Sequence, residues 1–91
     1  MSAIEKLVAR MRANRKAVRY DDLARVFGAL GWTAVSSGTG SHQRFSAPDG
    51  KAFVTVVRPH GGRTHVSPRA VDDLLGVWDA SHDKDSDDDR S

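Results

Sequence analysis

The chain has 91 residues, with fourteen lysines and arginines, twelve aspartates and glutamates, and no cysteine. This length allows one domain at most, and the lack of cysteine excludes a disulfide framework, a thiol nucleophile and a cysteine-ligated zinc site. No apolar stretch approaches the length of a membrane span, and the charged N-terminus is unlike a signal peptide. We therefore expect a cytoplasmic protein with no membrane partner.

The charge is distributed unevenly along the chain. Residues 79–91 contain six aspartates and two basic side chains, a net charge of −4, and no Leu, Ile, Val, Phe or Trp. Such a segment cannot bury enough apolar surface to offset its ordering entropy, so we expect a disordered acidic tail. Residues 1–78 carry the other twelve basic and six acidic side chains, a net charge of +6. A basic domain of this kind favours a nucleic-acid partner.

The first two helices are predicted by apolar residues at helical spacing. Ser2 and Glu5 are spaced as a capping box before the first helix, which we expect to end at Asn14. In the second helix, Asp21 is the expected N-cap residue and Gly31 the glycine that follows the C-terminus.

A third helix is predicted after Ser67-Pro68, a cap residue followed by a proline that suits the first helical position. It ends near Trp78, where the apolar spacing stops. Between the second and third helices, strand-forming residues occur in three stretches: 32–35, 41–46 and 51–57. Pro48-Asp-Gly50 is typical of a hairpin turn. Consecutive strands with short turns predict an α+β fold, in which helices cover one face of an antiparallel meander.

His42 and Arg44 share one face of the second predicted strand, while Gln43 and Phe45 share the other. We expect Phe45 to point into the core, which leaves His42 and Arg44 on the open face, about 7 Å apart along the strand. A histidine transfers protons near neutral pH, and an arginine neutralises charge on phosphate oxygens. This pair suits RNA cleavage by the 2′-hydroxyl, which needs no metal. The alternative is an ordinary surface histidine.

The loop after the third strand carries Arg58, His60, Arg63 and His65. It is either a phosphate-contacting loop or an ordinary connector. A metal site would need His42 as a third ligand, and nothing in the spacing is diagnostic of one, so we expect neither a metal nor another cofactor. The aromatic residues that could stack on bases are expected in the core instead: Trp32, Phe53 and Trp78.

Several short elements, in this order and at this spacing, resemble the HicA family of bacterial toxins: Leu30-Gly-Trp32, Gly40-Ser-His42, Phe45, Pro48-Asp-Gly50, Val54-Thr-Val56, Pro59-His-Gly61 and Ser67-Pro68. The resemblance runs from about Val18 to Trp78. It implies a fold like a double-stranded-RNA-binding domain (dsRBD), α-β-β-β-α. We therefore expect one domain over 1–78, with the family core at 18–78, an extra N-terminal helix within 1–17, and the tail at 79–91.

The resemblance also implies an activity and a partner. The activity is that of an mRNA interferase, an endoribonuclease that cleaves mRNA and arrests growth, with His42 as its catalytic residue. The partner is a HicB-like antitoxin that covers this histidine, so we expect a monomer alone and a hetero-oligomer with the antitoxin. The side chains expected to contact RNA are Ser41, Arg44, Arg58, His60 and Arg63.

Three alternatives stay open at this stage. The chain could be a non-catalytic RNA-binding module of the same dsRBD-like fold, because binding alone does not require His42. It could be a protein-interaction domain whose basic surface meets an acidic partner. DNA binding is disfavoured, because Arg69 is the single basic residue of the predicted third helix, which makes a poor recognition helix.

Overall fold

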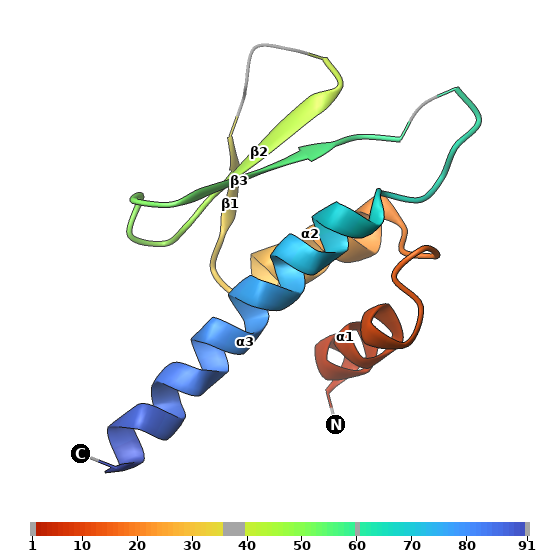
Figure 1. Cartoon of the computed structure of the whole chain (residues 1–91). Helices are drawn as coiled ribbons and strands as arrows, with labels where there is room; N and C mark the ends of the chain where they lie inside the picture. Colours follow the sequence, from red (N-terminus) through yellow and green to blue (C-terminus); the bar gives the residue numbers. More distant parts are fainter. Residues whose placement is uncertain (1, 36–39, 60, 91) are drawn as a thin grey trace.

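The computed structural model describes residues 2–35, 40–59 and 61–90. Its elements are α1 (Ala3–Ala13), α2 (Tyr20–Ala29), β1 (Thr33–Val35), β2 (His42–Ser46), β3 (Phe53–Val57) and α3 (Pro68–Arg90). The strands form one antiparallel sheet in the order β1-β2-β3. All three helices lie on the same side of this sheet (Figure 1). The predicted α+β class, the order of the elements and the meander are confirmed.

The first helix begins with the predicted capping box. The Ser2 hydroxyl accepts a hydrogen bond from the Glu5 N–H at 3.1 Å, and the Glu5 carboxylate accepts one from the Ser2 N–H at 2.8 Å. This backbone N–H stabilises the charged carboxylate and holds the pKa of Glu5 below its ordinary value. The helix ends at the predicted residue, Asn14, whose N–H donates to a carbonyl of the last turn.

The second helix begins earlier than predicted. Arg19, not Asp21, is the N-cap residue, and among the residues described by the structure no side chain caps this end. The reason is that Arg19 is extended and forms an isolated antiparallel bridge with His65, while the Val66 N–H donates to the Val18 carbonyl at 2.9 Å. Asp21 therefore lies in the first turn, where a carboxylate still interacts favourably with the helix N-terminus.

The third helix begins as predicted and extends further than predicted. The Ser67 hydroxyl accepts a hydrogen bond from the Ala70 N–H at 3.3 Å, and Pro68 is the first helical residue. The helical backbone then continues past Trp78 to Arg90, so the acidic segment that we expected as a tail from Asp79 starts as helix. Adding a residue to an existing helix costs far less than nucleating one, which accounts for this extension.

Two contacts accompany the first turn of that extension. Asp79 forms an ion pair with Arg12 of α1, and the His82 ring stacks on Trp78 at 4.3 Å while its Nδ1 donates to the Trp78 carbonyl. Asp79 and His82 are exposed, and Leu75 is the last buried residue among the side chains that the structure describes. Within the described ranges, no helix is long and apolar enough to cross a bilayer.

The core lies between the sheet and the helices. Phe27 of α2 stacks on Phe45 of β2 with 4.5 Å between the ring centroids, and it contacts Trp32 at 5.5 Å. Trp32 and Trp78 are partly buried against this cluster, as predicted. The extra N-terminal helix joins the same core through three buried side chains: Leu7, Val8 and Met11. Figure 1 shows α1 beside α2 and α3, away from the sheet.

A substitution in α1 tests whether this helix contributes to the stability of the whole fold. Met11 is 2% exposed, so Met11→Ala leaves a cavity and should lower the free energy of unfolding by about 2–5 kcal/mol. Chemical denaturation measures this loss. Lys6→Ala, an exposed change on the same helix, is the control and should change stability by less than about 0.5 kcal/mol. Equal stability of the two variants would mean that α1 is not part of the cooperative core.

Candidate active site

The open face of the sheet carries the two residues that the sequence placed there. His42 and Arg44 are exposed, whereas Gln43 and Phe45 on the other face of β2 are buried. His42 pairs with Val57 of β3, and Arg44 pairs with Thr55. The predicted alternation along β2 is therefore confirmed, and His42 and Arg44 point away from the helices.

Ser41 lies directly beside the candidate catalytic histidine. Its hydroxyl oxygen is 3.3 Å from Nδ1 of His42. A hydrogen bond at Nδ1 orients an imidazole ring and selects its tautomer. The backbone carbonyl of Ser41 also accepts a hydrogen bond from the Arg58 N–H at 2.7 Å, which joins the start of β2 to the residue after β3.

Phe53 lies on the open face, and the expectation that it belongs to the core is wrong. Its side chain is 53% exposed. Register explains this, because Phe53 pairs with Ser46 and so shares a face with Thr55 and Val57, whereas Val54 and Val56 face the core. The guanidinium carbon of Arg44 lies 5.2 Å from the centre of the Phe53 ring. The open face is thus partly aromatic, which the sequence did not indicate.

Gln43 links the inner face of the sheet to Arg58. It is a buried polar side chain, 8% exposed, whose amide nitrogen donates to the carbonyls of Val35 and Arg44 at 2.8 and 3.0 Å. Its amide oxygen accepts a hydrogen bond from the Arg58 guanidinium, which also lies 5.5 Å from the centre of the Tyr20 ring. Arg58 therefore points to the helix side of the sheet, opposite to His42.

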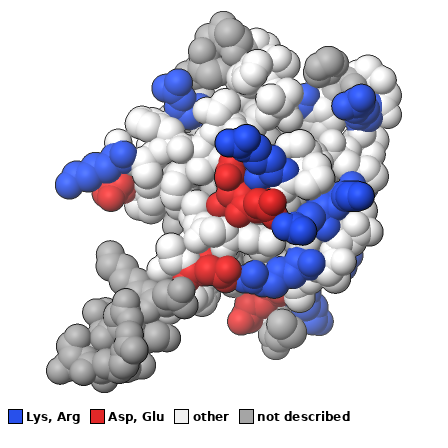
Figure 2. All heavy atoms as spheres, in the orientation of Figure 1, with Lys and Arg blue, Asp and Glu red and all other residues white. Residues whose placement is uncertain are grey.

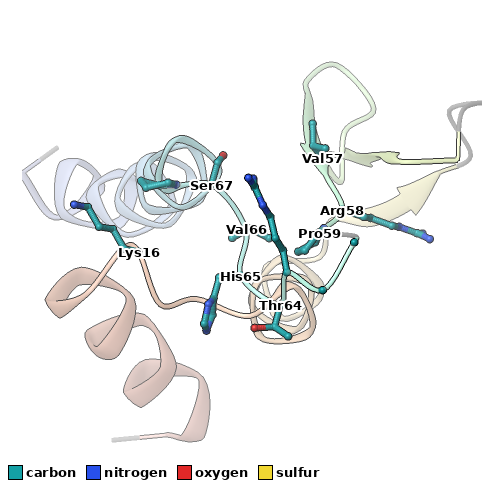
Figure 3. Close-up of a pocket in the computed structure, with 12 residues that line it drawn as sticks. Lys16, Val57, Arg58, Pro59, Thr64, His65, Val66 and Ser67 are labelled. Carbon is teal, nitrogen blue, oxygen red and sulfur yellow. The ribbon is translucent and has the colours of Figure 1, made fainter.

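An open groove of about 910 Å³ follows the loop between β3 and α3. Arg58 and Arg63 line it, and both also line a second hollow of about 420 Å³ beside Tyr20. Figure 3 shows Lys16 on one side of the groove and Arg58 on the other, with His65 between them. The structure therefore brings Arg58 and Arg63 together, at the end of the sheet rather than on its open face.

The basic surface is interrupted by acidic side chains. In Figure 2, most of the coloured Lys and Arg lie on the right-hand half of the view, with Asp and Glu set among them. Two ion pairs join the N-terminal part of the chain to α3, Arg12 with Asp79 and Arg15 with Asp72. These pairs offset two of the positive charges that a polyanion could contact.

One predicted contact residue, His60, lies outside the described residues, as does the 36–39 segment before β2. The remaining predicted site residues form two groups: Ser41, His42 and Arg44 at β2, and Arg58 and Arg63 at the groove. Within the described ranges, no three His, Asp or Glu side chains cluster as metal ligands would. Sequence reasoning missed Gln43 and Phe53, whose roles depend on pairing across the sheet.

The comparison with protein families covers this region of the chain. The family model described as the HicA toxin of bacterial toxin–antitoxin systems matches residues 20–65, half of the chain. The chain belongs to the HicA toxin family. The HicA match includes α2, the whole sheet and the loop with Arg58 and Arg63, and it leaves α1 and α3 outside. Neither the search of curated proteins nor the search of solved structures found a match.

The contact between Arg58 and Gln43 predicts a cost in stability. Arg58→Ala leaves the buried Gln43 oxygen without this donor, so the free energy of unfolding should fall by about 1–3 kcal/mol. Chemical denaturation measures the loss. Arg63→Ala, an exposed change in the same loop, is the control and should be close to neutral. A neutral Arg58→Ala would show that water replaces the guanidinium at Gln43.

Proposed function

We propose that this HicA-family protein is an endoribonuclease that cleaves mRNA in the cytoplasm and that a HicB-like antitoxin neutralises. The observation that carries the proposal is the pair His42 and Arg44, exposed side by side on the open face of the sheet within the family match. One residue moves protons near neutral pH and the other neutralises phosphate charge, the two requirements of phosphodiester cleavage. Gln43, buried between them on the opposite face, and Phe45, buried next to Arg44, keep both side chains pointing outward.

The proposed reaction is a transesterification within the RNA. The 2′-oxygen of one nucleotide attacks the adjacent phosphorus, and the bond from phosphorus to the 5′-oxygen of the next nucleotide breaks. The 2′-hydroxyl loses a proton and the leaving oxygen gains one, which yields a cyclic phosphate and a free 5′-hydroxyl. His42 carries out one of these transfers, and water or the product fragment completes the other. Arg44 stabilises the charge that develops on the phosphate oxygens.

The positions of the basic residues support a proposed path for the RNA. His42 and Arg44 lie on the open face, whereas Arg58 and Arg63 line the groove on the helix side. An RNA that contacts both groups therefore passes around the end of the sheet, where Ser41 and Arg58 are joined through their backbones. His60, in the same loop, is proposed as a further contact. The antitoxin is proposed to cover the open face and with it His42.

Replacing the histidine tests the catalytic role. His42→Ala should lower RNA cleavage by about 10²–10⁴-fold and abolish growth arrest on expression, while RNA binding persists. Rates of cleavage, RNA affinity and cellular mRNA integrity measure this. Thr55→Ala, an exposed change opposite Arg44, is the control and should keep most of the activity.

The outcomes separate the candidate functions. A loss of cleavage smaller than tenfold in His42→Ala would exclude His42 as the acid or base. If the wild-type protein binds RNA without cleaving it, the non-catalytic RNA-binding module is the correct function.

The salt dependence of RNA binding tests the groove. Removing one phosphate contact should reduce the slope of log affinity against log salt by about one unit, so we expect this change in both Arg58→Ala and Arg63→Ala. Arg58→Lys keeps the charge and should keep the slope, although it loses the planar donor group that reaches Gln43. An unchanged slope in Arg63→Ala, whose side chain is exposed, would remove Arg63 from the proposed interface.

A further inference from the structure

The open face of the sheet exposes two large apolar side chains beside its charged residues. Phe53 and Val57 are 53% and 52% exposed, and both lie in β3 on the same face as His42 and Arg44. A large aromatic ring in this position is not needed for the core, which Val54 and Val56 reach from the other face of the strand. Phe53 is therefore available to a ligand of this face.

The register places Phe53 in line with the catalytic pair. His42 pairs with Val57, Arg44 with Thr55, and Ser46 with Phe53. Each step of two residues along a strand covers about 7 Å, so Phe53 lies two steps, about 13 Å, from the level of His42. Arg44 lies between them, with its guanidinium carbon 5.2 Å from the centre of the Phe53 ring. A proton-transfer group, a cation and an aromatic ring thus follow one another across the face.

We propose that Phe53 is a stacking platform for an unpaired nucleobase, and that Arg44 binds a phosphate between this base and the scissile bond. The inference rests on the proposed function and specifies its substrate class as single-stranded RNA. The chemistry of the open face favours a nucleotide as the ligand. A nucleotide combines a flat aromatic base with an anionic phosphate, and the face offers an exposed ring with a guanidinium next to it.

The present contact between Arg44 and Phe53 does not prevent this binding. At an exposed site the attraction between a guanidinium and a phenyl ring is weak. The arginine exchanges it for a charge-assisted hydrogen bond to phosphate, which is stronger, and the base then takes its place on the ring. Arg44 in the free protein therefore lies over part of the ring, most of which stays open to solvent.

A platform of this kind selects the state of the RNA rather than its sequence. Every base has a flat aromatic face, so stacking on Phe53 tolerates all four bases. In a duplex the faces of the bases are already stacked on their neighbours, and they are not accessible to a ring on a sheet surface. The proposal therefore predicts a preference for single strands, in contrast to the duplex preference that a dsRBD-like fold by itself suggests.

The test measures RNA binding without cleavage. The probe is a short fluorescent oligouridine that carries 2′-O-methyl groups, which block attack by the 2′-oxygen, and its duplex with the complementary strand is the second probe. The variants are Phe53→Ala, Phe53→Leu and Phe53→Trp in the full chain, with Val57→Ala as the control matched for exposure on the same face. Thermal denaturation confirms that each variant is folded.

The expected result is a loss of affinity for the single strand of about 5- to 150-fold in Phe53→Ala. Phe53→Leu should lose a similar amount, because leucine keeps the apolar surface without an aromatic face, and Phe53→Trp should bind at least as tightly as the wild type. The duplex affinity should be nearly unchanged in all Phe53 variants, and Val57→Ala should bind the single strand like the wild type.

Several outcomes would overturn the platform. Wild-type affinity in Phe53→Ala or Phe53→Leu would exclude stacking, and an equal loss in Val57→Ala would indicate general apolar contact. Unchanged RNA affinity, together with self-association of the wild type that Phe53→Ala abolishes, would assign the ring to a protein contact.

The two proposals fail separately. If the wild type cleaves unmodified RNA while Phe53→Ala and Phe53→Leu bind the probe like the wild type, the platform is wrong and the nuclease stands. If binding depends on Phe53 and unmodified RNA is not cleaved, the platform stands and the nuclease is wrong.

Discussion

The stack of Phe45 on Phe27 determines the direction of every other side chain in β2. Because side chains alternate along a strand, the burial of Phe45 places Gln43 inward and sends His42 and Arg44 to the opposite face. Because β2 pairs with β3, the same alternation fixes the faces of β3, where Val56 faces the core and Phe53 faces outward. The contact between Phe27 and Phe45 thus determines which side chains lie on each face of the sheet.

The helices and strands, and the exposed positions of His42 and Arg44, could be predicted because they depend on residues close together in the sequence. Apolar spacing identified the helices, and the alternation of polar and apolar residues along β2 identified its faces. In β3 the sequence from Phe53 to Val57 is apolar on both faces, except for one threonine, so the alternation that worked for β2 was absent. Which of its side chains face the helices follows from register with β2, and register is a tertiary property.

The other errors have the same cause. Helix α2 begins earlier than predicted because Arg19, the residue before it, pairs with His65, more than forty positions further along the chain. The role of Arg58 at the inner face depends on Gln43, which was predicted to share a face with Phe45 but whose partner follows the next strand. The family match likewise begins at residue 20, so it does not account for α1, which supplies Leu7, Val8 and Met11 to the core.

The alternation along β2 also separates the side chains that stabilise the fold from those of the proposed site. His42 and Arg44 contribute little buried surface, while Phe45 and Gln43 hold the strand in place from the other side. Under the proposed function, a single substitution on the open face would abolish the activity and leave the fold intact. Such an inactive variant would keep the surface that a neutralising partner binds, and it would compete with active protein for that partner. A lineage could in this way lose the toxic activity in one step while keeping the protein folded.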